Sequence, residues 1–498
     1  MDKDINSSIG VTLKKLINSK NNSVMHDDFI ELCKKEGYSK IVNILSEISS
    51  YEECAVYFSN IKKCRKRKIK TIATICHYSN IGGVARVNAE LMNLLVKMGY
   101  NVVFFSPAKI TESDYSYSKK IKRICIPDYS KVEDRLIALE KHCMEEDIDV
   151  VINHEWGNKN FIWDCILIKL LNIAFIQYCH GLFSYTFSTG KESLYQPEAF
   201  KISDVVLAIS ETSAKFYQMN GCNTYFVHNP IPQDLYNKKK ASLDSNHVLM
   251  LGRLSKEKYP IEALEIFKRV KDKMPEIILD VVGEGNAEKE AKEFVKKNNL
   301  ESAVIFHGGI SVDNIDKFFL NSSCMLFTSK MEGYPMAVLE SKAYGLPLIS
   351  YDLPYLYLFR DKRGILTAPI GDFDVMSNYL YRLMSDNDFR NKMGEESSES
   401  FEELKKYNIE KTWNNIFKIC INETVVDKDY YNPELLSDNE KYIMPVMIEM
   451  ILKGYNNTFF YSKEYKLGQK LLYFPKRLKK ILKKLVLFYP YTMEKKIQ

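Results

Sequence analysis

The strongest constraint in this sequence is a repeated alternation between short apolar runs and longer stretches with helical periodicity. The runs of strand length in the first half are residues 72–76, 101–106, 150–153, 174–179 and 204–210. Strands that alternate with helices at this spacing predict a parallel sheet with helices on both faces. A second series of the same kind starts at His247 and continues past Gly364. We therefore predict an α/β protein with two facing, doubly wound, Rossmann-like domains and a ligand site between them.

The composition agrees with this size of fold. The chain has 498 residues, of which 46% are hydrophobic, enough for two domain cores and extensions. Its net charge of +6 is small for this length and gives no reason to expect a nucleic-acid partner. The 11 cysteines show no CxxC spacing, which is typical of reduced thiols in a cytosolic protein. No signal-peptide core and no run of about 18 apolar residues is visible, so we expect a cytoplasmic protein.

Residues 331–350 place two carboxylates, Glu332 and Glu340, in an otherwise apolar segment. Gly333 permits a tight turn, and Pro335 suits the first position of a helix. The segment therefore predicts a loop and then a helix, between two strands. A solvated glutamate on a helix face is the plain alternative for Glu340.

The start of this predicted helix can bind an anion. Its first free backbone N–H groups lie near Met336 and Ala337, at the end of the helix dipole that carries partial positive charge. Glu340 shares its helix stripe with Met336 and Ala343. A carboxylate among apolar neighbours needs a partner, and a ligand rich in hydroxyls would be one.

Two cations follow the first strand of the second series. Arg253 comes directly after Gly252, and Lys258 lies further along the same strand-to-helix loop. A guanidinium fork and a point charge can grip a diphosphate, although two surface cations are the plain alternative. The next strand ends in Gly283 and Gly285, which could let a nucleotide base lie against the backbone or could form only a turn.

Glycine and histidine residues follow several of the predicted strands in the first half of the chain. Gly82 and Gly83 open a helix and either allow close approach of a phosphate or sugar or form only a tight turn, and the GxGxxG dinucleotide fingerprint is absent. His180 ends a strand at the predicted ligand site, which favours a functional role. His154 and Glu155 end another strand, where they could meet an acceptor or serve packing.

We interpret His228 as structural. No cluster of side chains has metal-ligand spacing, so we expect neither a metal nor a cofactor.

Together these motifs resemble the retaining, nucleotide-sugar-dependent glycosyltransferases of family four, which have the GT-B fold. The resemblance covers about residues 68–423, with Tyr259 where the family usually has a glycine after its clamp lysine. The shared features are the Glu-x7-Glu motif, the diphosphate-clamping pair, the N-terminal glycine loop and the active-centre histidine, carried here by Glu332 with Glu340, Arg253 with Lys258, Gly82 with Gly83, and His180.

The resemblance implies a role for each residue. Arg253 and Lys258 would neutralise the leaving diphosphate without a metal. Glu340 would accept hydrogen bonds from the ribose, Glu332 would hold the transferred sugar, and His180 would lie near the reacting carbon. The donor-binding set is then Gly82, Gly83, Arg253, Lys258, Gly283, Gly285, Glu332, Gly333, Pro335, Met336, Ala337 and Glu340.

The same reading divides the chain into five parts. They are an N-terminal helical extension with a basic linker (1–67), an acceptor-binding domain (68–230), a donor domain (231–405), a crossover helix (406–423) and a C-terminal extension (424–498). Residues 62–70 hold seven basic residues in nine, which fits a solvated linker or a contact with anionic lipid.

The C-terminal extension has a distinct charge pattern. Residues 463–484 hold nine basic residues and one acid, with apolar residues at helical spacing. This pattern predicts a basic amphipathic helix on an anionic membrane, or a terminal helix docked on its own domain.

The resemblance implies a hexosyltransferase that uses a UDP- or GDP-linked sugar and a glycan, lipid-linked or protein acceptor. We place it in cell-surface polysaccharide or glycoconjugate assembly, at the inner face of the cell membrane. Three alternatives stay open: a noncatalytic partner subunit that stabilises another transferase, protein O-glycosylation, and a sugar-nucleotide epimerase on the same fold. Loss of the acid pair or the cationic pair would be the usual sign of the partner subunit, and both pairs are present.

Overall fold

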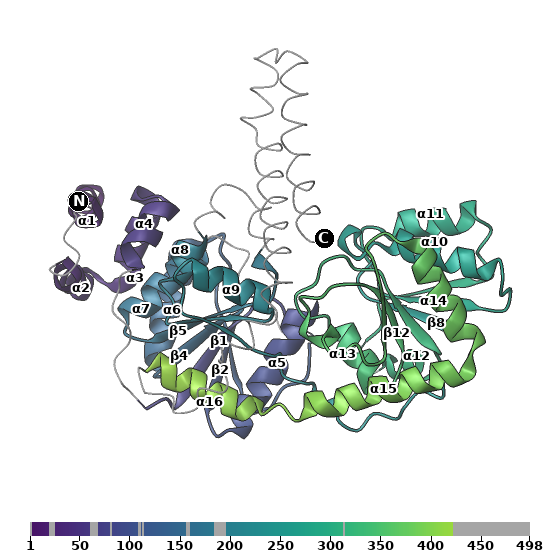
Figure 1. Cartoon of the computed structure of the whole chain (residues 1–498). Helices are drawn as coiled ribbons and strands as arrows, with labels where there is room; N and C mark the ends of the chain where they lie inside the picture. Colours follow the sequence, from purple (N-terminus) through teal and green to yellow (C-terminus); the bar gives the residue numbers. More distant parts are fainter. Residues whose placement is uncertain are drawn as a thin grey trace, which may run out of the picture.

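The computed structural model contains two parallel sheets, each covered by helices (Figure 1). It describes residues 2–18, 25–59, 68–79, 82–107, 111, 114–155, 160–183, 196–311 and 314–421. The first sheet has the order β3-β2-β1-β4-β5-β6-β7 and the second the order β10-β9-β8-β11-β12-β13. Every pairing between these strands is parallel. The predicted pair of doubly wound, Rossmann-like domains is therefore confirmed.

The central strands of the first domain are buried on both faces of their sheet. Strands β1, β4 and β5 are buried at every position, as expected for a parallel sheet between two helix layers. Its strands are β1 Thr71–Ile75, β2 Asn101–Ser106, β3 Lys122–Cys125, β4 Val150–Asn153, β5 Ala174–Cys179, β6 Val205–Ala208 and β7 Thr224–Phe226. Its helices are α5 Gly82–Lys97, α6 Val132–Glu145, α7 Phe161–Leu170, α8 Gln196–Phe200 and α9 Glu211–Met219.

Four N-terminal helices precede this domain, and α3 and α4 pack on its outside. They are α1 Asp2–Asn18, α2 Met25–Glu36, α3 Tyr38–Ile48 and α4 Tyr51–Phe58. Helix α3 contacts α6 and α7, because Ile41, Val42 and Leu45 form an apolar stripe that is fully buried. Ser50 begins α4 with a capping box, in which its hydroxyl accepts from the Glu53 N–H at 3.2 Å. Most of the predicted basic linker, residues 62–67, lies outside the described residues.

The second domain repeats the same plan. Its strands are β8 His247–Leu251, β9 Ile278–Val282, β10 Val304–Gly308, β11 Cys324–Phe327, β12 Leu348–Tyr351 and β13 Ile365–Ala368. Its helices are α10 Pro260–Lys271, α11 Glu288–Lys297, α12 Asp316–Leu320, α13 Met336–Ala343 and α14 Phe373–Ser385. Short 3₁₀ turns occur at η3 Gln233–Leu235, η4 Lys256–Lys258 and η6 Tyr357–Phe359.

The last described helices connect the domains again. Helix α15 Asn387–Lys405 packs on α13 and α14, and α16 Ile409–Cys420 then lies against β5 and β6 of the first domain (Figure 1). Trp413 anchors α16, because its side chain is fully buried with its ring 5.9 Å from that of Tyr178. The predicted amphipathic tail, with all of residues 422–498, lies outside the described residues.

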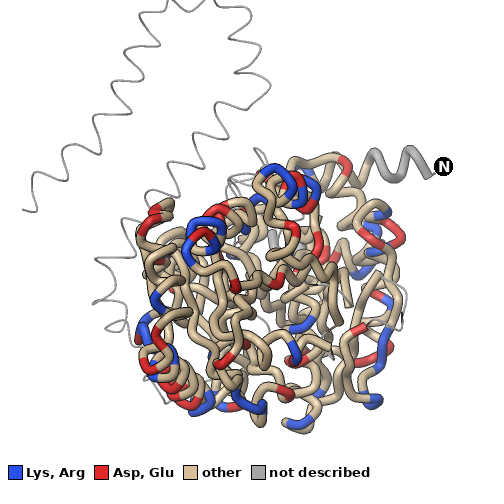
Figure 2. The backbone as a smooth tube through the Cα atoms, turned by 90° about the vertical axis from the view of Figure 1, so that its right-hand side faces the viewer, with Lys and Arg blue, Asp and Glu red and all other residues tan. Residues whose placement is uncertain are grey.

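The surface charge is mixed. Figure 2 shows basic and acidic positions interspersed over the outer helices of the side in view. The cysteines of the described residues are free thiols. Among the same residues, no helix combines the length and the apolar character needed to cross a bilayer.

Candidate active site

The strand order of each sheet reverses at one point, between β1 and β4 in the first domain and between β8 and β11 in the second. Ligands of doubly wound sheets bind beyond the carboxyl ends of the strands at such a point. The loops after β8 and β11 carry Arg253, Lys258 and Glu332, and His154 follows β4 directly. The fold therefore brings candidates from distant parts of the sequence to the two reversal points.

Lys258 and Glu332 form an ion pair between Nζ and Oε1 across these two loops. The hydroxyl of Thr328, at the end of β11, lies 3.0 Å from the backbone oxygen of Lys258 and donates to this turn. Arg253 is exposed and has no ion-pair partner among the described residues. The loop after β8 thus presents one cation held in place by a carboxylate and one cation open to an anionic ligand.

Tyr259 takes a left-handed conformation, with φ 50° and ψ 53°, directly before Pro260 starts α10. That conformation costs a non-glycine residue about 1–2 kcal/mol, which is why a glycine suits this position. The ammonium of Lys330 lies 4.0 Å from the centroid of the Tyr259 ring, and this cation–π contact offsets part of the cost. Tyr259 therefore keeps the left-handed turn that a glycine would form, and its ring adds a contact with Lys330.

Gly283 and Gly285 support the loop that carries Arg253. The N–H of Gly252 donates to Val282 at 3.0 Å, and a Cβ on Gly283 would lie 2.0 Å from the Gly252 oxygen. A Cβ on Gly285 would lie 2.3 Å from the Leu254 oxygen. Contact between two loops thus explains both glycines, and a nucleotide base lying against them stays a prediction.

The start of α13 faces the first domain. Pro335 is its N-cap, and the N–H groups of Met336 and Ala337 have no acceptor among the described residues. A Cβ on Gly83, in the first turn of α5, would lie 3.8 Å from the Met336 side chain. A Cβ on Gly333 would lie 3.0 Å from the backbone oxygen of His180. The loop and helix start of the second domain therefore lie directly against α5 and the end of β5.

Glu340 is buried in α13 and forms an ion pair with Arg86 of α5, in the other domain. Arg86 also lies 3.2 Å from Asp234, in the segment between the two sheets. Burial raises the pKa of Glu340, and the charge of Arg86 opposes that rise. We predicted that this carboxylate needs a partner. Its partner within the chain is a cation from the opposite domain, Arg86.

His154 and His180 form the first-domain part of the site. Their rings are stacked with centroids 5.0 Å apart, and His154 Nδ1 lies 2.8 Å from His180 Nε2. Burial lowers the pKa of His180 to about 3 and that of His154 well below its usual value, so both rings are neutral. Glu155 does not join them, because its carboxylate accepts from the backbone N–H of His77. The structure therefore pairs His154 with His180 and separates both from Glu155.

Comparison with known families fits this geometry. Residues 81–235 match the family described as Glycosyltransferase Family 4, and residues 233–400 match glycosyl transferases group 1. The chain carries the two domains of a GT4-like glycosyltransferase. Its fold is GT-B, as in the structure of Anabaena HepE in complex with UDP and glucose, which has a TM-score of 0.57 and 14% identity and covers 70% of this chain and 98% of that one.

Curated relatives of this chain are themselves named as glycosyltransferases. The amylovoran biosynthesis glycosyltransferase AmsD of Erwinia amylovora is 27% identical over 297 residues, 57% of this chain and 81% of AmsD. An uncharacterized glycosyltransferase of Haemophilus influenzae is 24% identical over 286 residues, 56% of this chain and 79% of that protein.

Among the described residues, no group of three or more His, Cys, Asp or Glu is placed to hold a metal ion.

Sequence reasoning missed Arg86 and Asp234 in this glycosyltransferase. A signal for Arg86 was present, because it lies on a helix among Ala85, Val87 and Ala89, which are all buried. A buried arginine needs an acidic partner, so an arginine at this helix position predicts a carboxylate nearby. Asp234 gave no comparable signal, since it lies in a polar connecting segment.

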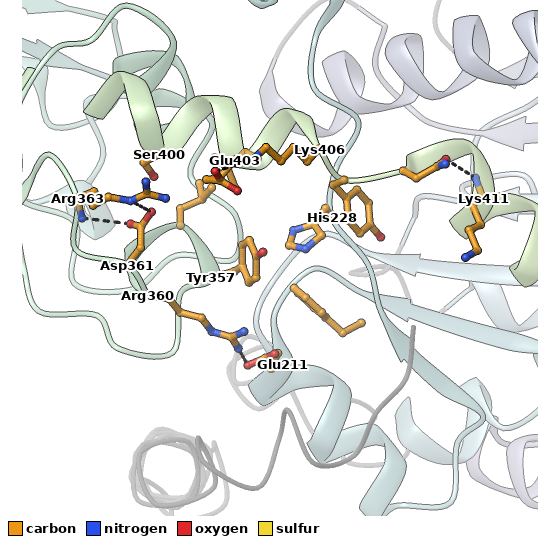
Figure 3. A pocket seen from close by; sticks show the side chains of 15 residues that line it. Glu211, His228, Tyr357, Arg360, Asp361, Arg363, Ser400, Glu403, Lys406 and Lys411 are labelled. Carbon is orange, nitrogen blue, oxygen red and sulfur yellow. Dashed lines mark hydrogen bonds and ion pairs between the residues drawn. The ribbon is translucent and has the colours of Figure 1, made fainter. Parts of the chain in front are cut away.

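A cavity of about 830 Å³ is lined by residues of both domains of the glycosyltransferase (Figure 3). Glu211 and Arg360 form an ion pair across the domains, and Arg363 lies 3.0 Å from Asp361. His228 lies at its wall, with its ring 4.0 Å from that of Tyr357, and burial lowers its pKa to about 3. None of Arg253, Lys258, Glu332 and Glu340 lines this cavity, so it is separate from the candidate active site.

Proposed function

We propose that this protein is a retaining hexosyltransferase that moves a sugar from a nucleotide-diphosphate sugar to an acceptor hydroxyl. The observation that carries the proposal is the Lys258–Glu332 pair at the strand reversal of the second sheet, next to Gly333, which lies against the His180 backbone. A diphosphate on the cations would leave its sugar between the two domains. The donor is UDP- or GDP-linked, and the UDP in the HepE structure favours UDP for the first trials.

Each side chain then has a task. Arg253 and Lys258 bind the diphosphate and stabilise the negative charge that grows on it as the bond to the sugar breaks. The free N–H groups of Met336 and Ala337 add their partial positive charge at the start of α13. Glu332 accepts from the sugar hydroxyls, and Glu340 accepts from the ribose. These roles correspond to the Glu-x7-Glu motif of family four.

The reaction keeps the configuration of the anomeric carbon, because the acceptor attacks from the same face from which the leaving group departs. The bond between the anomeric carbon and the phosphate oxygen breaks, and its electron pair goes to that oxygen. The acceptor oxygen bonds to the carbon, and its proton goes to the leaving phosphate. His180 stays neutral throughout because burial lowers its pKa to about 3, so it serves as a hydrogen-bonding group next to the sugar.

The clamp consists of protein cations, so we propose that transfer needs no metal ion. Two positive charges on one loop supply the stabilisation that a divalent ion would give to the leaving diphosphate. Turnover should then persist when the enzyme is assayed in excess EDTA. Loss of turnover in EDTA, restored by Mg²⁺ or Mn²⁺, would contradict this part of the proposal.

The acceptor is a glycan, a lipid-linked sugar or a protein, in surface polysaccharide or glycoconjugate assembly at the inner face of the cell membrane. The name of AmsD and the nine basic residues of segment 463–484 support this setting. Deletion of residues 463–498 should release the protein from vesicles that contain anionic phosphatidylglycerol. A full-length protein that never binds such vesicles would contradict the membrane location and leave the transferase assignment intact.

A panel of nucleotide sugars tests the activity directly. The purified protein is incubated with UDP- and GDP-linked hexoses, and nucleotide release is measured with and without acceptor extracts. We expect slow release of one nucleotide alone and faster release with acceptor. Isomerised sugar with no release would identify an epimerase, and no turnover with any donor and extract would favour the noncatalytic partner subunit.

A further inference from the structure

Arg86 links the two domains at the candidate donor site. It lies in α5 of the first domain and is only 7% exposed, yet both of its terminal nitrogens contact groups outside that domain's core. Nη1 pairs with Glu340 Oε1 in α13, and Nη2 lies 3.2 Å from Asp234 Oδ1. A buried guanidinium with two carboxylates is expensive to misplace, so this contact fixes how α5 and α13 meet.

The two oxygens of Glu340 differ. Oε1 is taken by Arg86, whereas Oε2 has no hydrogen-bond partner among the described residues and is not sealed from solvent. Arg86 could act in two opposite ways: it could compete with a ligand for Glu340, or it could hold the carboxylate in place for one. An ionised carboxylate has acceptor positions on both oxygens, so a ligand hydroxyl can bind Oε2 while Arg86 stays on Oε1. The free oxygen favours the second role.

We infer that Arg86 is a positioning residue for the nucleotide donor, holding Glu340 from the opposite domain so that Oε2 accepts the ribose hydroxyls. This inference rests on the proposed function. It makes the donor site incomplete in the second domain alone, because one of its carboxylates depends on α5 for its orientation. Domain contact and donor affinity are then coupled through a single ion pair.

The charge of Glu340 depends on the same contact. The titratable and charged groups that act on it are Arg86 of α5, Asp234 and Lys238 of the connecting segment, Tyr344 at the end of α13, and Tyr115 before β3. Burial raises the pKa of Glu340, and Arg86 is the strongest influence that lowers it. Removal of Arg86 should therefore let Glu340 take up a proton at a higher pH, and a protonated Glu340 accepts fewer hydrogen bonds.

The test measures the affinity of UDP and GDP for the full-length protein by calorimetry, with thermal unfolding as a check that each variant is folded. The variants are Arg86→Met, Glu340→Gln, the double variant and Arg86→Lys. Arg360→Met is the matched control, because Arg360 also pairs across the domains, with Glu211, but lies at the separate cavity (Figure 3).

We expect Arg86→Met to weaken binding of the preferred nucleotide by about 10- to 100-fold, the loss typical of hydrogen bonds to a charged group. Glu340→Gln should give a similar loss and the double variant no further loss, since both changes remove one function. Arg86→Lys should restore part of the affinity, and Arg360→Met should leave it unchanged. The affinity of Arg86→Met should also fall between pH 8 and pH 5.5 more steeply than that of the wild type.

Three results would overturn the inference while leaving the proposed function in place. They are tighter binding by Arg86→Met, which would make Arg86 a competitor, additive losses in the double variant, and an equal loss in Arg360→Met, which would reduce Arg86 to general domain adhesion. A wild-type protein that binds neither nucleotide would overturn the proposed function itself, and the inference with it.

Discussion

The two sides of the candidate active site differ in charge. The first-domain side holds His154 and His180, which share one hydrogen bond and are both neutral because they are buried, and the cation Arg86. The second-domain side holds two cations and two carboxylates, Arg253, Lys258, Glu332 and Glu340. Under the proposed function, the second domain would supply most of the charges that a nucleotide-diphosphate donor needs, and the histidine pair would supply neutral surroundings for an acceptor hydroxyl.

The carboxylates extend this comparison. Glu332 takes its cation, Lys258, from its own domain, whereas Glu340 takes Arg86 from the other domain. The first pair can therefore form in an isolated second domain, but the second pair requires both domains together. The Lys258–Glu332 contact is thus formed within one domain, and the Arg86–Glu340 contact is formed by both domains together.

The largest effect should come from the charged side. Lys258→Ala should lower turnover of the nucleotide sugar by about 10²–10³-fold, because one of the groups that stabilise the leaving diphosphate is lost. Lys256→Ala is the matched control, since Lys256 is an exposed lysine of the same 3₁₀ turn. Steady-state rates with the donor found in the panel make the comparison. Near-wild-type turnover in Lys258→Ala would remove the clamp from the mechanism.

Alanine in place of glycine should lower the free energy of unfolding by different amounts in the two domains. Gly283 and Gly82 both have positive φ, 133° and 85°, so alanine costs about 1–2 kcal/mol of backbone strain at either position. Only at Gly283 does the added Cβ meet another backbone atom, the Gly252 oxygen at 2.0 Å, whereas it meets nothing within 4 Å at Gly82. Gly283→Ala should therefore lower the free energy of unfolding by about 1–3 kcal/mol more than Gly82→Ala, in urea titrations. Equal losses would show that the loop after β8 relaxes freely.

The sequence predicted the local half of this site and missed the joint half. The parallel sheets follow from apolar runs between amphipathic helices, and parallel strands bring their carboxyl ends to one edge. Lys258 and Glu332 meet for that reason, because β8 and β11 are neighbours in the sheet. Any sequence with this strand order would bring those two loops together.

The Arg86–Glu340 pair could not be predicted in the same way. It depends on how α5 of one domain meets α13 of the other, and periodicity within a domain carries no information on that contact. The pairing of His154 with His180 was within reach, since β4 and β5 are consecutive strands of one sheet. Sequence reasoning instead grouped His154 with its neighbour Glu155, which the fold turns toward His77.

A smaller effect should follow from a change on the neutral side. His154→Phe should lower turnover about tenfold, because His180 loses the hydrogen bond that orients its ring at a cost of about 1–1.5 kcal/mol. The pH profile of kcat should stay flat from pH 5.5 to 8 in both proteins as far as His180 is concerned, since burial lowers its pKa to about 3. Glu155→Gln is the control, because the Glu155 carboxylate accepts from the His77 backbone N–H. A new titration near pH 6.5 in the wild type that His180→Gln removes would contradict the neutral state of His180.

The smallest effect should be one of stability against pH. His228 is a buried histidine of the first domain outside the active site, and burial lowers its pKa from 6.5 to about 3. The unfolded chain therefore binds a proton below pH 6.5 that the folded chain refuses, so stability falls as pH falls. Between pH 8 and pH 6 this one ring should cost about 0.8 kcal/mol. From pH 8 to pH 6, the free energy of unfolding of His228→Phe should therefore fall by about 0.8 kcal/mol less than that of the wild type. Tyr357→Phe, which changes the ring neighbour of His228, should behave as the wild type does.

The measurement is the free energy of unfolding at the two pH values, from urea titrations of the full-length proteins. His228 Nδ1 is buried without a hydrogen-bond partner, so phenylalanine should cost little at pH 8, where the ring is neutral in both states. His154 and His180 carry the same sign of linkage, and their loss of stability should persist in His228→Phe. If His228→Phe and the wild type lose equal stability between pH 8 and pH 6, the His228 ring does not exclude a proton from the folded chain, and this prediction is wrong.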